Sequence, residues 1–274
     1  MKNIDTLVED INKLFEEGHI SSPKLITELG DTLADVVNTR LAAYKEERKP
    51  YLRLSMIGKP DRQIYYEVNG FKGEELSAST KIKFLFGDIL EALLLFLAKE
   101  AGHTVSEEQQ EVIVNGVVGH KDAKIDGVTI DVKTASAYSF KKFEDGGILF
   151  DDPFGYVAQL SAYDQQGGGF LVLDKSNGTL CLSLVPQGAI IDAEKRISHI
   201  KEVLAANEPP PKCYKEVPDG KSGNMKLPVG CSYCKFKHTC WKDSNDGAGL
   251  RTFAYSTGAK FLTTVVKEPR VYEG

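Results

Sequence analysis

The sequence predicts an α/β (α+β) fold with a mixed central sheet flanked by helices. Three features predict it: an apolar helix at residues 81–99, a strand hairpin within residues 112–134, and a later helix followed by two more strands. This order of helix, strand, strand, helix and strand favours one sheet with helices packed on its faces. A cysteine-containing segment follows this core.

The remaining elements are predicted from spacing and turn residues. Apolar side chains at helical spacing from Ile4 to Phe15 predict a first helix, and Ser22-Pro23 begins a second that runs towards Tyr44. Residues 45–50 end that helix. Further along the chain we expect a helix from Asp152-Pro153 to near Gly167, strands at 169–173 and 179–185, a helix at 192–206, and a proline boundary at 209–211.

The hairpin is expected to place two carboxylates opposite each other. Asp126-Gly127 is a strong signal for a two-residue turn, and the residues after it alternate between apolar and polar as a strand does. With this pair as the turn, Ile125 pairs with Val128, and Asp122 lies opposite Asp131. Directly opposed like charges destabilise a sheet, so a cation between the two carboxylates would relieve the repulsion.

Lys133 belongs to the same strand face as Asp131, because side chains two residues apart point the same way. Two carboxylates and a lysine around a divalent ion suit phosphoryl transfer. The ion polarises the phosphate and acidifies a bound water, and the lysine meets developing negative charge. Asp and Lys also occur on solvated strand faces, so a surface pair is the alternative interpretation.

Two helices contribute further polar residues. Glu91 interrupts the apolar run of the helix at 81–99. A carboxylate among such neighbours either lies at the helix margin or is held by a charge or a metal. Gln159 and Tyr163 are four residues apart and therefore share one helix face, which by itself is an ordinary pair.

Four short motifs occur in order along the chain: Gly87-x3-Glu91, Gly119-x2-Asp122, Asp131-x-Lys133 and Gln159-x3-Tyr163. In this order they resemble the PD-(D/E)xK nuclease superfamily, and within it the RecB-like exonucleases, which include CRISPR-associated RecB-like nucleases and related phage exonucleases. The resemblance covers about residues 55–241. Two positions depart from the family pattern: Lys121 stands where the family has proline, and Glu91 stands where many RecB-like members have histidine.

The resemblance implies a restriction-endonuclease-like core and a metal site. Glu91, Asp122, Asp131 and the backbone carbonyl of Val132 would hold one or two Mg²⁺ or Mn²⁺ ions. Lys133 would position the attacking water and stabilise the transition state.

The resemblance also implies DNA contacts. Gln159 and Tyr163 match the motif that organises the site and touches the DNA strand. Ser55, Lys59 and Arg62 lie in a segment that resembles the region of phage-type exonucleases where a DNA end enters. A plain glycine-proline loop is the alternative for that segment.

Four of the five cysteines lie in the C-terminal third, at Cys213, Cys231, Cys234 and Cys240. A C-x2-C pair lets two thiolates converge on one metal, and a third follows after a short turn. No secretory signal is evident, so we expect a reducing cytoplasm, bacterial or that of a phage-infected host cell, where metal binding is favoured over disulfides. Cys181, in an apolar run, is expected to be a buried small hydrophobe.

The run from Cys231 to Cys240 is similar to the last three ligands of the four-iron cluster in iron-sulfur RecB-like proteins. This resemblance favours a 4Fe-4S cluster with Cys213 as the fourth ligand, although in those relatives the first cysteine usually precedes the nuclease core. Zinc, with His238 as a substitute ligand, is the alternative. Either centre would hold the C-terminal segment onto the core.

Composition sets the outer limits. The chain has 274 residues and a net charge of -5, which argues against a protein that coats DNA nonspecifically. No apolar run is long and charge-free enough to span a bilayer. We expect a helical segment with the DNA-entry loop at 1–70, the nuclease core at 71–208, and the cysteine-cluster segment with a tail at 209–274.

The sequence therefore predicts a metal-dependent DNA exonuclease that hydrolyses phosphodiester bonds in recombination or phage genome processing. A single-strand or structure-specific endonuclease on the same core is one alternative. A catalytically silent DNA-binding or adaptor protein built around the cysteine cluster is an alternative of another class. DNA is the expected partner, without a membrane; a homo-oligomer, a recombination partner protein and the polarity of cleavage stay open.

Overall fold

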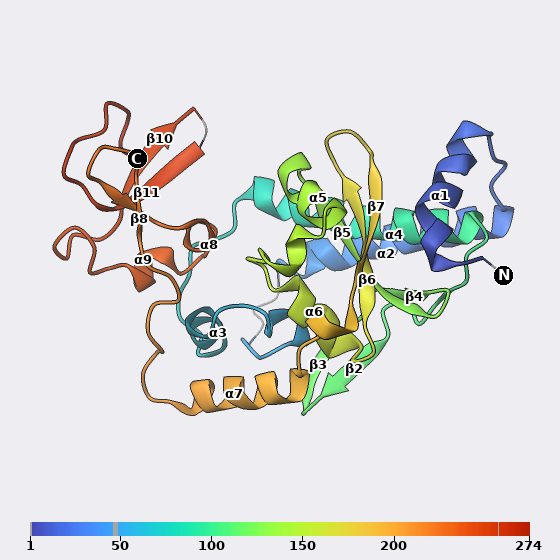
Figure 1. Ribbon diagram of the computed structural model, residues 1–274, viewed down its shortest axis with the longest axis horizontal. Helices are drawn as coiled ribbons and strands as arrows, with labels where there is room; N and C mark the ends of the chain where they lie inside the picture. Colours follow the sequence, from blue (N-terminus) through green and yellow to red (C-terminus); the bar gives the residue numbers. More distant parts are fainter. Residues whose placement is uncertain (1, 46–48, 257) are drawn as a thin grey trace. The chain divides into compact units, whose positions relative to one another are not determined.

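The computed structural model describes residues 2–45, 49–256 and 258–274. Contacts along the chain divide it into two compact units (Figure 1). Unit 1 comprises Met1–Gly58 and Leu76–His199, and unit 2 comprises Lys59–Glu75 and Ile200–Gly274. The three-part division expected from the sequence, with boundaries after residues 70 and 208, stays a prediction.

Unit 1 contains a central sheet with helices on both faces. Its helices are η1 (Ile4–Thr6), α1 (Leu7–Glu16), α2 (Pro23–Ala42), η2 (Leu54–Met56), α4 (Ala78–Glu100), α5 (Ala137–Glu144), η3 (Gly147–Leu149), α6 (Tyr156–Tyr163) and η4 (Gln187–Ala189), and α7 (Ala193–Ala205) begins in it. Its strands are β1 (Val105–Ser106), β2 (Glu111–Val114), β3 (Val117–His120), β4 (Ala123–Ile125), β5 (Val128–Ala135), β6 (Gly168–Asp174) and β7 (Leu180–Val185).

The central sheet has the strand order β1-β4-β5-β6-β7. The pair of β5 and β6 is parallel, and the other neighbours are antiparallel. A parallel pair needs a long crossover, and α5 and α6 lie within the connection between β5 and β6. The predicted mixed central sheet flanked by helices is confirmed, and it is the arrangement expected for a restriction-endonuclease-like core.

The two faces of this sheet have separate cores. Side chains of α1 and α4, including Leu7 and Leu94, pack with Ile130 of β5 on one face. Side chains of α5 and α6, including Phe140 and Leu160, pack with Phe170 and other β6 residues on the opposite face. Figure 1 shows α4 and α5 on either side of the strands. This layering brings α4 and α6 to the sheet from different sides.

The predicted hairpin turn is confirmed. Asp126 and Gly127 both have positive φ, at 50° and 83°, as the tight hairpin turn requires. Ile125 pairs with Val128, as predicted, and the ladder continues to the pair of Ala123 and Ile130. The ladder ends there, one residue short of the expected pair of Asp122 and Asp131. The strands β2 and β3 form a two-stranded sheet of their own.

The predicted helix from Asp152-Pro153 to Gly167 is wrong at both ends. Helix α6 begins at Tyr156 and ends at Tyr163. Gly155 precedes it with a left-handed φ of 75°, and a Cβ on Gly155 would lie 2.4 Å from the backbone of Gly58. The contact between these two glycines, 97 positions apart in the chain, sets where the helix starts. Asp152 still caps it, because its carboxylate accepts hydrogen bonds from the N–H groups of Gly155 and Val157 at 2.9 Å.

Other expected elements lie close to their predicted places. The helices near the N-terminus, the apolar helix, the strands at 169–173 and 179–185 and the helix at 192–206 correspond to α1, α2, α4, β6, β7 and α7. The sequence reasoning missed α5 and the short edge strand β1. The segment expected to end α2 includes residues 46–48, which lie outside the described residues.

Unit 2 combines α3 (Asp61–Val68) with the C-terminal part of the chain. It contains β8 (Val217–Pro218), β9 (Met225–Lys226), α8 (Val229–Ser232), α9 (Lys237–Cys240), β10 (Arg251–Tyr255) and β11 (Gly258–Thr264), and its sheet has the order β10-β11-β9-β8. Tyr65 and Tyr66 of α3 pack against Phe236, and Glu67 forms an ion pair with Lys235 at 2.7 Å. Among the described helices, none combines the length and apolar character that crossing a bilayer requires.

Candidate active site

The structure brings the six predicted site residues to one region of unit 1 from four separate elements. Glu91 comes from α4, and Asp122 immediately precedes β4. Asp131 and Lys133 come from β5, and the remaining two, Gln159 and Tyr163, come from α6.

Asp131 is the centre of this group. It is only 1% exposed, and its carboxylate forms an ion pair with the Lys133 ammonium. Gln159 Nε2 donates to Asp131 Oδ1 at 3.3 Å and to the Tyr163 hydroxyl at the same distance. The predicted Asp-x-Lys pair on one strand face and the predicted Gln–Tyr pair on one helix face therefore meet at a single carboxylate.

Asp122 lies beside this pair at the end of the hairpin ladder. Its Oδ2 accepts a hydrogen bond from the N–H of Val132 at 2.7 Å, so the carboxylate is fixed over the strand that carries Asp131. The predicted role of the Val132 carbonyl as a metal ligand stays a prediction.

Gln109 connects Glu91 to Asp122. Its side-chain amide donates to Glu91 Oε1 at 2.6 Å, and its backbone N–H donates to the Asp122 carbonyl at 3.0 Å. Its φ of 50° is left-handed, which is uncommon for a residue other than glycine and is held only by the surrounding contacts. The sequence reasoning missed Gln109, and no local pattern in the polar run around it could have revealed the contact.

Tyr156 is the second residue that the sequence reasoning missed. The Lys133 ammonium lies 5.0 Å from the centre of its ring, a cation–π geometry that limits where the ammonium can point. A signal was available, because Tyr156, Gln159 and Tyr163 are spaced by three and four residues and so share one face of α6.

The site carries more negative charge than its lysine neutralises. Burial raises the pKa of Glu91 to about 7; the nearby Lys133 charge opposes this, and Asp131 reinforces it. Burial, with the charges of Asp131 and Glu91, also raises the pKa of Asp122 well above its usual value.

Lys133 and Tyr163 respond to the same charges. Burial lowers the pKa of Lys133, but the negative charges of Asp131 and Asp122 outweigh it and hold the pKa above its usual value. Burial and the Asp131 charge raise the pKa of Tyr163 to about 12. Lys133 is therefore a cation and Tyr163 a neutral hydroxyl at neutral pH.

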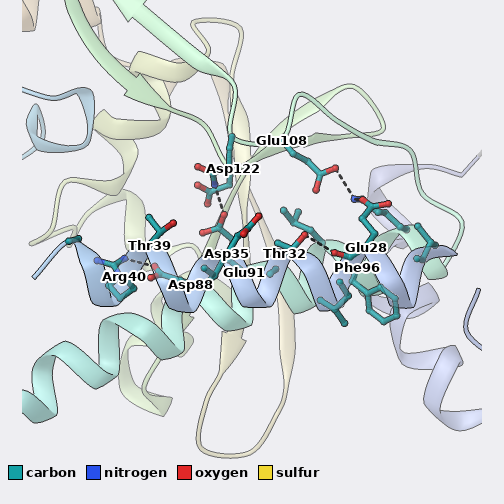
Figure 2. Close-up of a pocket in the computed structure, with 18 residues that line it drawn as sticks. Glu28, Thr32, Asp35, Thr39, Arg40, Asp88, Glu91, Phe96, Glu108 and Asp122 are labelled. Atoms are coloured by element: carbon teal, nitrogen blue, oxygen red, sulfur yellow. Dashed lines mark hydrogen bonds and ion pairs between the residues drawn. The ribbon is translucent and has the colours of Figure 1, made fainter. Parts of the chain in front are cut away.

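A cavity of about 770 Å³ lies between α2, α4 and the segment around Gln109 (Figure 2). Asp35, Glu91 and Asp122 gather in its middle, and Arg40 forms an ion pair with Asp88 at one end. At the other end Lys99 pairs with Glu28 at 2.5 Å and with Glu108 at 2.8 Å. The cavity lining is thus rich in carboxylates, with Glu91 and Asp122 as the members that also belong to the site.

The donor set suits a divalent cation. Three carboxylates, Glu91, Asp122 and Asp131, surround one ammonium, and oxygen ligands are those that Mg²⁺ prefers. Among the residues that the structure describes, no three His, Cys, Asp or Glu side chains stand ready as a metal shell. Binding would require these carboxylates to turn from their present partners, Gln109, the Val132 N–H and Lys133, towards the ion.

Gly119 explains how Tyr163 reaches the site. A Cβ at this position would lie 2.7 Å from Leu54 Cβ and 3.0 Å from the Tyr163 ring. Only the missing side chain lets β3, the 54–58 loop and α6 pack this closely. The glycine of the Gly119-x2-Asp122 motif therefore has a packing role beside the candidate site.

The three residues predicted to receive a DNA end fall into different units. Ser55 is an exposed residue of η2 in unit 1, whereas Lys59 and Arg62 belong to unit 2. Arg62 donates to the Pro210 carbonyl, and its guanidinium lies 5.2 Å from the centre of the Tyr66 ring. Arg62 thus has a packing role within unit 2, and the predicted DNA contacts of all three residues stay predictions.

The four C-terminal cysteines line one small cavity in unit 2, with a volume of about 30 Å³. Tyr66, Phe236 and Trp241 share the lining. Cys231 N–H is bonded to the Pro228 carbonyl, and a turn brings Cys234 N–H to the Cys231 carbonyl at 3.0 Å. The structure therefore brings together all four predicted ligands, Cys213, Cys231, Cys234 and Cys240, within an aromatic cluster.

The thiols of this cavity differ from exposed cysteines. Burial raises the pKa of Cys231 to about 12, and the neighbouring Cys240, Cys234 and Cys213 add to the effect. All five cysteines of the chain are free thiols. Four sulfur donors suit zinc or an iron-sulfur cluster. Among the described residues, no three of these thiols are close enough to hold a metal ion as they stand, so either centre would require the thiols to move. Cys181 is half-buried on β7 in unit 1, whereas the other four cysteines belong to unit 2.

No protein-family model matches the chain, and no curated protein matches it. Among solved structures, the chain is similar to the crystal structure of SSO0001, with a TM-score of 0.42 and 19% identity over 77% of this chain and 93% of that chain. It is also similar to an alkaline exonuclease (LHK-Exo) from Laribacter hongkongensis, with a TM-score of 0.41 and 16% identity over 61% of this chain and 92% of that chain. Likenesses this weak leave the chemistry to be inferred from the side chains.

Proposed function

We propose that the protein is a metal-dependent deoxyribonuclease, and specifically an exonuclease, that hydrolyses phosphodiester bonds in recombination or phage genome processing. One observation carries this proposal: Glu91, Asp122, Asp131 and Lys133 converge from three separate elements onto one partly buried site. A purely structural group would rarely place three carboxylates around a single lysine. The mutual repulsion of the carboxylates raises the pKa values of Glu91 and Asp122 and destabilises the fold.

The metal would be held by Glu91, Asp122, Asp131 and the Val132 carbonyl. When bound, Mg²⁺ or Mn²⁺ would polarise the scissile phosphate and acidify a bound water. Lys133 is fixed between Asp131 and the Tyr156 ring, where its ammonium can donate to a phosphate oxygen as negative charge develops.

Gln159 and Tyr163 support this arrangement. The Gln159 amide donates to Asp131 and to the Tyr163 hydroxyl, which keeps Asp131 oriented and leaves the Tyr163 O–H able to donate outward. A neutral hydroxyl and an amide suit contact with a DNA backbone, to which side chains of these types commonly donate.

The exonuclease proposal is tested with linear DNA and covalently closed circular DNA of the same sequence, with Mg²⁺ and with a chelator. We expect Mg²⁺-dependent release of nucleotides from the linear substrate while the circle stays intact. Rapid cutting of the closed circle would instead support an endonuclease on the same core. No hydrolysis of either substrate with Mg²⁺ or Mn²⁺ would contradict the proposed function.

We also propose that Cys213, Cys231, Cys234 and Cys240 hold one metal centre in unit 2. The resemblance to iron-sulfur nucleases supports a 4Fe-4S cluster, and four sulfur donors around one cavity also suit zinc. A reducing cytoplasm would keep the four thiols available for either centre. Metal analysis of protein purified without oxygen distinguishes them: iron with sulfide indicates the cluster, and one zinc per chain indicates the ion.

A further inference from the structure

Three large aromatic side chains, from α5 and from the loop that precedes α6, are exposed on unit 1. Tyr138 of α5 is 76% exposed, and Phe150 and Phe154, in the loop between η3 and α6, are 92% and 48% exposed. We refer to these three residues as the aromatic platform. Large exposed apolar groups gathered in one region commonly mark a binding surface.

The platform stands on rigid supports. Phe140 and Phe143 anchor α5 in the core beneath Tyr138, and Ile148 anchors the turn that precedes Phe150. The Phe150 N–H is bonded to the Gly147 carbonyl at 3.1 Å. The backbone beneath Tyr138 and Phe150 is therefore anchored in the core, so the exposure of these two rings is a property of the fold.

Phe154 connects the platform to the candidate active site through Tyr156. The ring of Phe154 lies 5.5 Å from that of Tyr156, with 30° between their planes. Tyr156 in turn holds the Lys133 ammonium 5.0 Å from its ring centre, and Lys133 is paired with Asp131. A strand that reaches Lys133 thus passes rings on which its bases can stack.

Charge is mixed on the platform side, where Lys141 and Lys142 are accompanied by Glu144, Asp145, Asp151 and Asp152. The cavity beside α2 and α4 is lined by six carboxylates against Arg40 and Lys99, so it disfavours a phosphate chain. On the platform side, the Lys142 ammonium lies 5.2 Å from the centre of the Tyr138 ring, and Lys141 is its neighbour in sequence. Lys142 is also paired with Asp151, so stacking contributes more here than charge.

We propose that the aromatic platform binds the unpaired nucleotides of a DNA strand by base stacking and leads that strand to Lys133 and Asp131. This inference rests on the proposed function for the fate of the strand, but the binding itself needs no hydrolysis. Base–aromatic stacking tolerates any sequence, because every base has a π face.

The direct test is fluorescence of Phe150→Trp mixed with oligo(dT) in a chelating buffer. We expect stacking to quench the new tryptophan. Phe15 of α1 is 71% exposed and distant in sequence, so Phe15→Trp is the matched control and should not be quenched. Because the natural chain has a single tryptophan, the wild type supplies the baseline signal.

Affinity measured by anisotropy of labelled oligo(dT) gives the magnitude. Phe150→Ala should weaken binding by roughly 5- to 150-fold, the range for the loss of one stacked base, while Phe15→Ala leaves it unchanged. Lys141→Ala should reduce the slope of log affinity against log salt by about 0.7, and Phe150→Ala should leave that slope unchanged. Duplex DNA should show little dependence on Phe150.

Equal affinities of Phe150→Ala and Phe15→Ala for oligo(dT), with no quenching of Phe150→Trp, would overturn the platform and leave these rings as a surface for a protein partner. That outcome together with Mg²⁺-dependent cleavage by the wild type would leave the proposed function intact. Quenching of Phe150→Trp by oligo(dT), without cleavage by the wild type, would support the aromatic platform and contradict the proposed nuclease function.

Discussion

The charge excess of the candidate site predicts that the metal-free protein loses stability as pH rises. The pKa of Glu91 is 4.5 in an unfolded chain and about 7 in the folded protein. Between these values the folded state binds more protons than the unfolded state, so unfolding becomes easier as pH increases. A difference of this size corresponds to roughly 3 kcal/mol, lost progressively between about pH 4.5 and 7.

The assay is denaturant unfolding of the wild type and of Glu91→Gln in a chelating buffer across this pH range. The wild type should lose stability relative to Glu91→Gln by up to roughly 3 kcal/mol by about pH 8, because the variant has no charge to accept. Mg²⁺ added at the alkaline end should stabilise the wild type more than the variant.

Glu28→Gln is the control with the opposite sign. In the wild type, the hydrogen bond and ion pair with Lys99 lower the pKa of Glu28. The stability that Glu28 contributes is therefore present above its unfolded pKa and is lost as pH falls. A wild-type curve that stays parallel to that of Glu91→Gln across the whole range would refute the idea that Glu91 is buried beside uncompensated carboxylates.

Three further predictions follow from particular contacts. Gln109→Ala should weaken Mn²⁺ binding and DNA cleavage by about 10- to 100-fold, because Gln109 positions Glu91. Mn²⁺ titration of this variant and of the control Gln110→Ala measures the effect. Gly155→Ala should destabilise the folded protein by about 1–3 kcal/mol because of the left-handed φ alone, and the clash with Gly58 should add to this loss. Gly30→Ala, at an open helical position, should stabilise by about 0.5–1 kcal/mol, and thermal unfolding compares the two. Cys234→Ser should release the metal centre and lower the Tm more than Cys181→Ser does, whereas equal small shifts would argue against a centre.

Sequence reasoning worked where the determinant was local. The Asp126-Gly127 turn is fixed by the residues that occupy it, and from that turn the pairing of Ile125 with Val128 followed by counting. The placement of Asp131 and Lys133 on one strand face needed only the period of a strand. These local rules placed Asp131 and Lys133 together, whereas Glu91 was assigned to the site only through the family resemblance.

The failures have long-range causes. The start of α6 depends on the contact of Gly155 with Gly58, which no local propensity encodes. Gln109 reaches Glu91 from a loop with left-handed backbone, and α3 packs with the C-terminal cysteine segment although it is more than a hundred residues away in the chain. Helix α5 was missed because a short helix gives little periodicity.

The central claim is that Asp131 and Lys133 perform metal-dependent cleavage, and the most direct measurement is the rate of nucleotide release from linear DNA by Lys133→Ala at saturating Mg²⁺. We expect this rate to fall by roughly 100-fold or more, because the negative charge that develops in the transition state loses the Lys133 ammonium as a donor. The unfolding transition of the variant should remain cooperative. Lys124→Ala, a change on the neighbouring strand β4 that leaves Asp131 paired, should retain the wild-type rate. A Lys133→Ala protein that cleaves as fast as Lys124→Ala would contradict the account.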